Sequence, residues 1–433
     1  MSLPRYPHYK DSGVEWLGEV PEHWAVLPLY GTVAERKEPN KGMVEDNLLS
    51  LSYGRIVSKD ITSNDGLLPD SFETYQIVRT GDIVFRLTDL QNDKRSLRSA
   101  VVTETGIITS AYLAVIPKQA SSSYMSYLFR AYDTKKVFYS MGGGLRQSMK
   151  FDDLKRMPTV LPSPEEQALI ATFLDRKTAK IDELVAEQRR LMELLKEKRQ
   201  AVISHAVTRG LNPDAPLKPS GIEWLGDVPE HWVITKLTRL VTKVGDGLHG
   251  TPEYVDDSEF RFINGNNLSE GAISFTDTTR FVSEGEFSKH RVELDQKSLL
   301  LSINGTIGNL AFYQGESVML GKSAAYINCS DNLARDFLYW FLHSAQIRLY
   351  FDYSVTGTTI FNLSLESIRR MPIAVPAVDE QKKIISSIVK RVGHYDGLLV
   401  QAQLAIDLLQ ERRTALISAA VTGQIDVRGV VGG

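Results

Sequence analysis

The sequence lacks the residues on which several classes of protein depend. Its 433 residues include one cysteine, Cys329, which excludes an internal disulfide framework and a cysteine-rich zinc site and predicts a buried structural thiol. No apolar run reaches bilayer-spanning length, and the amino-terminal residues lack the apolar core of a signal peptide. We therefore expect a cytoplasmic protein of ordinary globular composition.

An excess of positive charge is also missing. The formal net charge is −3 and the isoelectric point is about 6.3, whereas stand-alone DNA-binding domains tend to be basic overall. Composition alone therefore does not predict nucleic-acid binding. If the chain binds DNA, its positive charge must be concentrated in patches.

Catalytic and cofactor-binding motifs are missing as well. Residues Gly245 to Gly250 have the glycine spacing of a dinucleotide-binding loop, but Thr251 and Pro252 follow where the phosphate-binding helix should begin. We expect a flexible loop there. The eight histidines show no metal-ligand spacing. We therefore predict that this chain contains no catalytic residue, metal site or cofactor of its own.

The sequence does contain a long internal repeat. Residues Ser12–Trp24 return as Ser220–Trp232, identical except for the conservative changes Val14/Ile222 and Glu19/Asp227. A repeat whose period is about half the chain outweighs any local motif as evidence of architecture. The chain is therefore expected to consist of two copies of one unit.

Each copy ends in a long helix. Ser163 and Pro164 form a helix start, with Glu166 placed for a capping box, and neither proline nor glycine follows until Gly210. Apolar and small residues then recur in steps of four and three, as in a coiled-coil seam about 65 Å long. The first seam comprises Leu174, Thr178, Ile181, Val185, Gln188, Met192, Leu195, Arg199 and Val202, and the second Ile388, Val392, Tyr395, Leu399, Ala402, Ile406, Leu409, Arg413 and Leu416.

The two globular segments, about 25–150 and 233–363, share a mixed α and β pattern but few residues. A conserved scaffold with divergent heads favours two heads that do one job on different targets; drift after duplication is the alternative. Their polar loops contain the side chains that contact base edges and phosphates. The candidate DNA-binding residues of the first head are Arg86, Thr88, Gln91, Asn92, Lys94, Arg95, Arg98, Arg146, Gln147 and Lys150, and those of the second are His249, Asn264, Asn266, Asn267, Asn304, Thr306, Lys322, Ser323, Thr358 and Thr359.

This arrangement resembles the DNA specificity (S) subunits of type I restriction–modification systems. The two copies of the Glu-Trp-Leu-Gly…Pro-Glu-His-Trp motif and the segment Pro162–Gln167 carry the resemblance, which covers essentially the whole chain. It implies an α+β fold in which two α/β target-recognition domains are joined by a pair of long antiparallel coiled-coil helices, with an internal pseudo-twofold repeat. The expected domains are residues 1–162 (first recognition domain), 163–208 (helical region), 209–376 (linker and second recognition domain), 377–423 (helical region) and 424–433 (tail).

The resemblance also implies a function. The chain would be a non-catalytic subunit that binds double-stranded DNA at a bipartite, asymmetric site. Two modification subunits would methylate adenine with S-adenosylmethionine, and restriction subunits would add ATP- and magnesium-dependent translocation and cleavage.

Two other interpretations stay open at this point. The chain could modify DNA by itself, or it could be a scaffold that uses the same helices to bind proteins and not DNA. If it is a specificity subunit, helix length should set the spacing of the two half-sites, which lie around one DNA turn, roughly 34 Å, apart.

Overall fold

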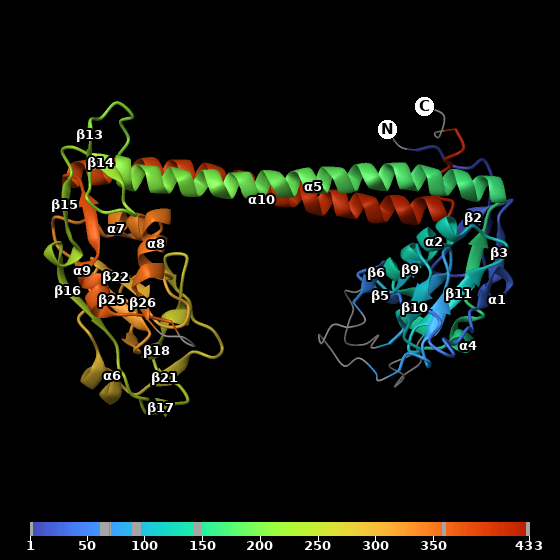
Figure 1. Cartoon of the computed structure of the whole chain (residues 1–433), viewed down its shortest axis with the longest axis horizontal. Helices are drawn as coiled ribbons and strands as arrows, with labels where there is room; N and C mark the ends of the chain where they lie inside the picture. Colours follow the sequence, from blue (N-terminus) through green and yellow to red (C-terminus); the bar gives the residue numbers. More distant parts are fainter. Residues whose placement is uncertain are drawn as a thin grey trace. The chain divides into compact units, whose positions relative to one another are not determined.

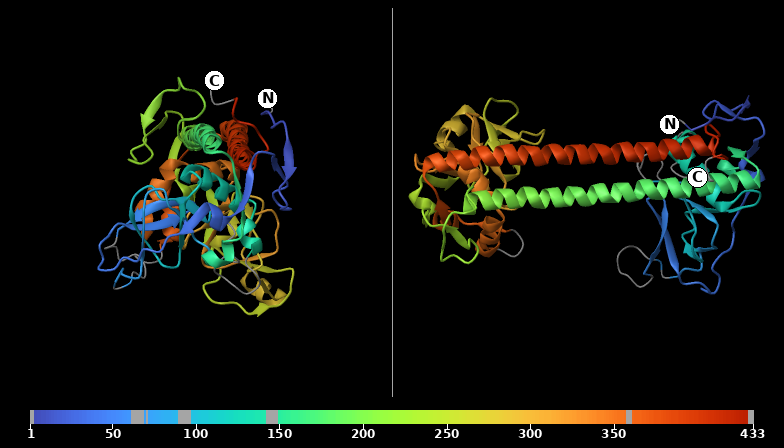
Figure 2. Two further views of the ribbon diagram at one scale, coloured as in Figure 1. Left: turned by 90° about the vertical axis from the view of Figure 1, so that its right-hand side faces the viewer. Right: turned by 90° about the horizontal axis from the view of Figure 1, so that it is seen from above.

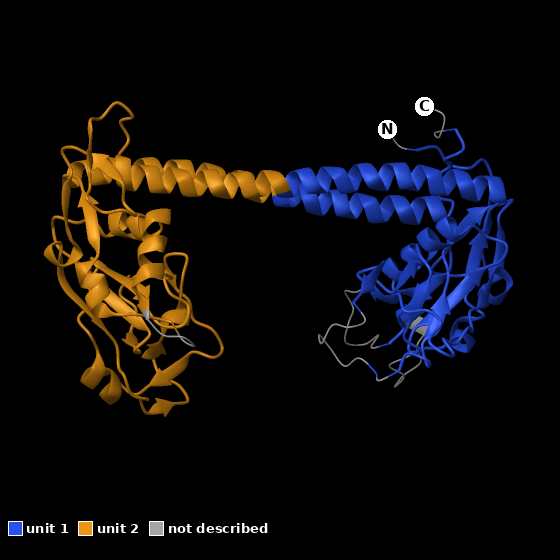
Figure 3. Cartoon of the chain, in the orientation of Figure 1, with its two compact units in different colours: residues 1–189, 403–433 blue, residues 190–402 orange. Residues whose placement is uncertain are grey.

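A computed structural model describes residues 3–60, 69, 71–88, 97–141, 149–356 and 361–429, with the backbone only at residues 140, 141 and 356. The chain divides into two compact units, residues 1–189 with 403–433 and residues 190–402 (Figure 3). Each unit contains part of both long helices, α5 (Pro164–Arg209) and α10 (Val378–Val421). The α+β fold expected from the sequence is confirmed.

Unit 1 contains two four-stranded sheets, in the orders β4-β11-β8-β9 and β6-β5-β10-β7. All pairs are antiparallel except β5 with β10. Strands β3 and β12 form a separate pair beside the long helices (Figure 1). The elements are β1 (Tyr9–Asp11), β2 (Glu19–Pro21), β3 (Ala25–Pro28), α1 (Leu29–Thr32), β4 (Val33–Glu35), β5 (Leu48–Ser52), β6 (Arg55–Lys59), β7 (Gln76–Val78), β8 (Ile83–Phe85), β9 (Ser99–Val101), β10 (Gly106–Ile108), β11 (Leu113–Pro117), α2 (Ser122–Thr134), α3 (Val137–Met141), α4 (Phe151–Leu154) and β12 (Pro158–Leu161).

Unit 2 repeats this plan. Its sheet β16-β25-β22-β23 corresponds to β4-β11-β8-β9, and its parallel pair β18 and β24 corresponds to β5 and β10. The elements are β13 (Leu217–Pro219), β14 (Asp227–Pro229), β15 (Val233–Lys236), η1 (Leu237–Arg239), β16 (Val241–Asp246), β17 (Tyr254–Val255), β18 (Arg261–Ile263), η2 (Gly265–Asn267), β19 (Leu268–Ser269), β20 (Ala272–Ile273), β21 (Arg280–Val282), α6 (Glu284–His290), β22 (Ser298–Ser302), β23 (Leu310–Phe312), β24 (Val318–Leu320), β25 (Ala324–Cys329), α7 (Arg335–Leu342), α8 (Ala345–Ser354), β26 (Val355–Thr356), β27 (Asn362–Leu363), α9 (Leu365–Arg370) and β28 (Pro372–Val375).

Within each unit the two long-helix segments lie side by side and run antiparallel (Figure 2). The seam residues predicted from the sequence are all buried or half-buried. The two arginines of the seam form ion pairs across it: Arg413 with Asp182 at 2.9 Å in unit 1, and Arg199 with Asp396 at 2.7 Å in unit 2. Arginine is therefore tolerated in the seam because its charged end reaches a carboxylate at the rim.

The repeated motif attaches each long helix to its unit. Trp24 and Trp232 are buried, and the neighbouring His23 and His231 each contact a glutamate in the first turn of a long helix, Glu166 and Glu380, at 2.9 Å. The buried glutamines that follow, Gln167 and Gln381, accept the backbone N–H groups of Ser121 and Ala334 at 2.8 Å. The motif therefore serves packing.

One expected element is different. The apolar spacing from Tyr124 to Tyr139 predicts one helix, but the structure has two, α2 and α3, with Lys136 between them at φ +60. A positive φ breaks a helix whatever the side-chain pattern. Cys329 is buried in β25, as expected, and burial raises the pKa of its thiol to about 12. No helix among the described residues is long and apolar enough to cross a membrane.

Candidate nucleic-acid interface

In unit 2, loops that are distant in sequence meet where strands β16, β18, β22 and β24 end. The Leu248 N–H donates to Leu320 O at 2.8 Å, and the Gly321 N–H donates to Ile263 O at 2.8 Å. The Ile303 N–H donates to Ser323 O at 3.0 Å. We call this surface the unit 2 edge; it comprises residues 246–250, 264–267, 303–307 and 321–323.

Glycines permit these loops to pack closely. A Cβ atom on Gly247 would lie 1.9 Å from Leu320 O, and one on Gly321 would lie 2.3 Å from Asn264 Oδ1. The glycine pattern at Gly245–Gly250 is therefore explained by backbone packing. The flexible loop that we expected there is wrong in part, because Gly245 and Asp246 belong to β16 and Leu248 pairs with Gly321.

The predicted residues of unit 2 fall into two groups. His249, Asn266, Thr306 and Lys322 are exposed, and the His249 ring lies 2.7 Å from the Asp246 carboxylate. The other group holds the loops together: the Ser323 hydroxyl donates to Asn264 Oδ1 at 2.9 Å, the buried Asn267 donates to Ser274 O at 3.0 Å, and the half-buried Asn304 pairs with Asn362. Thr358 and Thr359 lie outside the described residues.

In unit 1, the equivalent strand ends surround a cavity of about 580 Å³. Its lining includes two predicted residues, Arg86 and Thr88, which follow β8. The remainder were missed by the sequence reasoning: Ser50, Leu51, Ser52, Tyr53, Val57, Lys59 and Tyr112. We call this set of nine residues the unit 1 edge. The signal that could have revealed it is the alternation of Leu49 and Leu51 with Ser50 and Ser52 before a Tyr-Gly turn.

The other predicted residues of unit 1 are placed differently. Lys150 is exposed, next to Met149, whose N–H donates to Leu87 O at 3.0 Å. Arg98 is fully buried, where its guanidinium donates to Thr88 O at 2.8 Å and to the Tyr139 hydroxyl at 3.2 Å. We therefore withdraw Arg98 from the candidate DNA contacts, because its donors face protein acceptors. Gln91, Asn92, Lys94, Arg95, Arg146 and Gln147 lie outside the described residues.

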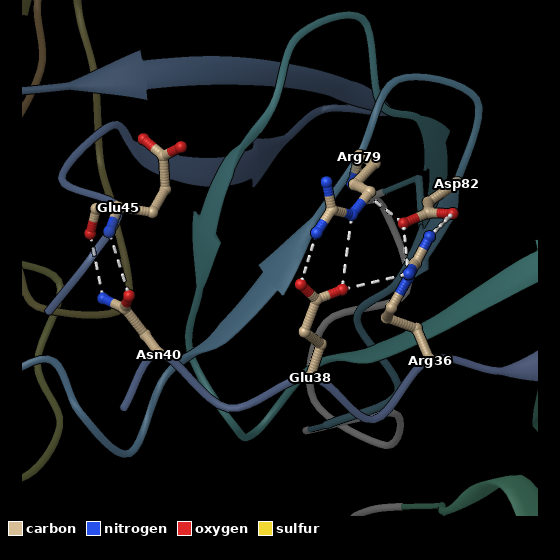
Figure 4. Close-up of polar contacts among 6 residues, drawn as sticks. All are labelled: Arg36, Glu38, Asn40, Glu45, Arg79 and Asp82. Atoms are coloured by element: carbon tan, nitrogen blue, oxygen red, sulfur yellow. Dashed lines mark hydrogen bonds and ion pairs between the residues drawn. The ribbon is translucent and has the colours of Figure 1, made fainter. Parts of the chain in front are cut away.

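A charged network fixes the segment that leaves β4 (Figure 4). The Arg36 guanidinium donates to both oxygens of the buried Asp82 at 2.9 Å. Arg36 also pairs with Glu38 at 3.1 Å, and Glu38 accepts from Arg79, which holds the pKa of the Glu38 carboxyl below its usual value. The Ile77 N–H then donates to Glu38 O at 2.7 Å, so the network fastens the segment to β7.

An asparagine shapes the loop that follows. The buried Asn40 exchanges two hydrogen bonds with the Glu45 backbone: its amide donates to Glu45 O at 2.9 Å, and its Oδ1 accepts from the Glu45 N–H at 3.1 Å (Figure 4). These two hydrogen bonds close the loop between residues 40 and 45. Among the described residues, no group of three or more His, Cys, Asp or Glu side chains could hold a metal ion.

Residues 229–396 match the family described as type I restriction modification DNA specificity domain. The matched residues all lie in unit 2. The chain is also similar to type I specificity subunits. It is 22% identical to the type I restriction enzyme EcoBI specificity subunit of Escherichia coli over 62% of this chain, and the match spans only 58% of that subunit's length. It is 21% identical to the StySPI specificity subunit of Salmonella potsdam over 94% of this chain and 90% of that subunit.

Solved structures agree in fold. One solved chain, from a structure of complex assembly and conformational transition of the type I R-M system, aligns with 93% of this chain over 98% of its own length. The TM-score is 0.69 and the sequence identity is 15%. The HsdS subunit from Thermoanaerobacter tengcongensis covers the same shares, with a TM-score of 0.53 and 16% identity. The resemblance to type I specificity subunits that the sequence predicts is therefore confirmed.

Proposed function

We propose that this chain is the non-catalytic DNA-recognition subunit of a type I restriction–modification complex, in which each unit reads one half of a bipartite, asymmetric site. The observation that carries the proposal is the repeated strand order in units 1 and 2, which presents different side chains at equivalent strand ends. Equivalent surfaces with unlike chemistry suit two unlike half-sites.

The two edges offer different contacts. In unit 1, Arg86 and Lys59 supply cationic donors, and arginine can bind the O6 and N7 atoms of guanine with two hydrogen bonds. In unit 2, Asn266 supplies an amide suited to adenine, while Thr306 and His249 supply neutral polar groups and Lys322 supplies a cation. The exposed Lys150 follows Met149, which bonds to Leu87 in the loop after β8, and it adds a phosphate contact in unit 1.

Partner subunits supply the chemistry in this proposal. Two modification subunits methylate adenine with S-adenosylmethionine after extruding the base, and restriction subunits add the ATP-dependent steps. Apolar side chains exposed on the long-helix segments of each unit provide docking positions for them. These are Leu184, Leu404 and Leu408 in unit 1 and Leu191, Leu194, Val389 and Val400 in unit 2. The complex works where the host DNA lies, in the cytoplasm.

The decisive experiment compares methylated motifs in host DNA with and without this gene. We expect one bipartite motif to disappear on deletion and to return when the gene is restored. Purified chain that methylated or cut DNA alone would indicate an enzyme. Absence of sequence-selective binding even with the modification partner would favour the protein scaffold.

The same assay tests the helices as a spacer. Seven residues inserted in both α5 and α10 add about 10.5 Å of helix, because each residue rises 1.5 Å. The expected result is an unchanged pair of half-sites separated by about three more base pairs, at 3.4 Å per base pair. An unaltered spacer would refute this role.

A further inference from the structure

The β5–β6 hairpin of unit 1 belongs to the sheet β6-β5-β10-β7. Strand β10 pairs with β5 only at Leu48, so beyond that residue the hairpin is a two-stranded ribbon with two different faces. Its strands pair antiparallel from Leu48 with Lys59 to Ser52 with Arg55. Leu49, Leu51 and Ile56 face the core. The opposite face presents Ser50 and Ser52 beside their partners Val57 and Arg55, with the exposed Lys59 at its end. One face is therefore buried. The other carries serine and basic side chains with the exposed Val57, and it is open except at its base, where Leu48 is buried.

The tip of this ribbon is a tyrosine in an unusual conformation. Tyr53 and Gly54 connect the strands with φ values of +45 and +75, as the tightest hairpin turn requires. Asparagine, aspartate or glycine normally occupies the first of these positions, because a positive φ is unfavourable for a bulky residue. The Tyr53 side chain is nevertheless 79% exposed. Neither packing nor backbone preference explains an aromatic residue there.

The side chain of Arg130 fixes the Tyr53–Gly54 turn. The Arg130 guanidinium donates to Gly54 O at 2.7 Å and to Ser99 O at 3.2 Å, so it joins the hairpin tip to β9. A Cβ atom at position 54 would lie 2.2 Å from the Arg130 guanidinium. The exposed ring is therefore displayed on a fixed turn.

The surroundings of the ring favour a nucleic acid. Tyr53 lines the unit 1 edge together with Lys59, Arg86 and the hydroxyl groups of Thr88 and Ser52. Cations and hydroxyls of this kind bind phosphates and base edges, and aromatic rings stack on bases. The major groove of B-form DNA is wide enough to admit a two-stranded β ribbon.

We propose that the β5–β6 ribbon enters a groove of the half-site read by unit 1, with its polar face toward the DNA and the Tyr53 ring in contact with a base. This inference rests on the proposed function and names the element that performs it in unit 1. Unit 2 has no equivalent turn among its described residues, because η2, β19 and β20 lie between its paired strands β18 and β21. Tyr53 is thus a specificity-determining residue of one half-site only.

The variant Tyr53→Gly separates the contribution of the Tyr53 ring to DNA binding from its contribution to folding. Tyr53→Gly removes the side chain and also relieves the positive φ, so we expect the melting temperature to stay constant or rise. Loss of one base contact should weaken binding to the cognate duplex about 5- to 100-fold. Tyr53→Phe keeps the ring and should bind within a few-fold of the wild type.

The control is an exposed aromatic residue of the same unit. Tyr30, 55% exposed, lies in α1 before β4, and therefore at the strand ends opposite the unit 1 edge. Tyr30→Ala should leave DNA affinity unchanged.

The measurement uses the full chain with its modification partner and the duplex identified from the methylated motif. Fluorescence anisotropy gives the affinity, and 2-aminopurine placed at successive positions of each half-site reports base contact. Positions of the adenines that the modification subunits extrude should respond in every variant. We expect the wild type and Tyr53→Phe to change the fluorescence at one further position, in the half-site read by unit 1, and Tyr53→Gly to abolish that change alone.

The outcomes separate the two proposals. If the wild type shows no sequence-selective binding, the proposed function fails. If the wild type binds selectively but Tyr53→Gly binds equally well, only the ribbon inference is refuted. It is also refuted if Tyr53→Gly loses the modification partner instead of DNA affinity, since Tyr53 would then contact protein.

Discussion

Units 1 and 2 share the strand order of one sheet and differ in surface chemistry. The sheets β4-β11-β8-β9 and β16-β25-β22-β23 match strand for strand. In both units a buried glutamine of a long helix accepts the N–H of the N-cap residue of a shorter helix, α2 in unit 1 and α7 in unit 2. The edges differ. The unit 1 edge is formed by the β5–β6 hairpin together with Arg86, Thr88 and Tyr112. The unit 2 edge is formed by glycine-rich loops that amide and hydroxyl hydrogen bonds hold together. Conservation of the frame thus leaves the edge loops free to change.

The largest difference in stability should come from two carboxylates that pair with basic side chains, the buried Asp82 in unit 1 and Asp246 in unit 2. Asp82→Asn leaves Arg36 without its buried two-oxygen partner and should destabilise unit 1 by about 3 kcal/mol. Asp246→Asn, which loses a pair with the exposed His249, should cost below about 1 kcal/mol. Hydrogen exchange resolved by unit would show the loss in unit 1 alone. Equal effects would contradict the expected difference between a buried and an exposed ion pair.

The shared frame predicts a second pair of variants with equal effects. Gln167→Ala removes the partners of the Ser121 N–H and Pro162 O, and Gln381→Ala removes the partners of the Ala334 N–H, Asn332 O and Pro376 O. Each should cost about 2 kcal/mol, in unit 1 and unit 2 respectively. Gln401→Ala, at an exposed position of α10, is the control and should have little effect. A cost confined to one unit would show that the frames are not equivalent.

The frame shared by the two units (the long helices, the matching sheets and the repeated motif) could be predicted from the sequence, because local periodicity indicates each part. The seam residues, the strands around Ile83–Phe85 and Ser298–Ser302 and the repeated motif each follow from patterns within a few turns or strands. The edges could not. Arg98 stands in a polar run that predicts an exposed loop, yet its backbone N–H donates to Asp133 and its side chain to Tyr139, partners that only the tertiary fold brings near.

The ribbon was missed for a related reason. Gly54 indicates a turn, but nothing local shows that Tyr53 and Lys59 end beside Arg86, which follows a strand of the other sheet. Which side chains meet at the unit 1 edge therefore depends on how strands distant in sequence pair, and this pairing cannot be inferred from a single sequence.

The salt dependence of DNA binding tests the contrast in charge. Lys59→Ala and Arg86→Ala should each lower the slope of log K against log salt by about 0.9 if each contacts a phosphate, and weaken binding accordingly. Asn266→Ala should leave the slope unchanged and relax base preference within the unit 2 half-site, by about 1–3 kcal/mol at one position. Anisotropy titrations at several salt concentrations on matched duplexes measure both. A reduced slope for Asn266→Ala would refute the assignment of base contact.

The smallest expected effect distinguishes the units at alkaline pH. In unit 1 the Tyr127 hydroxyl donates to Asp175 on α5 at 2.6 Å, and burial together with that carboxylate raises the pKa of Tyr127 to about 12. An unfolded tyrosine titrates near pH 10. Folding therefore favours the neutral phenol; this stability is fully present below about pH 10 and is lost as the pH rises through about 12.

Counting from the equivalent residues Ser121 and Ala334, unit 2 has Trp340 at this position, which does not titrate. Tyr127→Phe should cost about 1 kcal/mol at neutral pH, from the lost hydrogen bond. The difference in unfolding free energy between wild type and variant should change between about pH 10 and pH 12, because only the wild type loses the Tyr127 contribution. Urea unfolding across this range measures the gap, with the exposed Tyr30→Phe as control. A gap that stayed constant would show that Tyr127 and Asp175 do not couple unit 1 to pH.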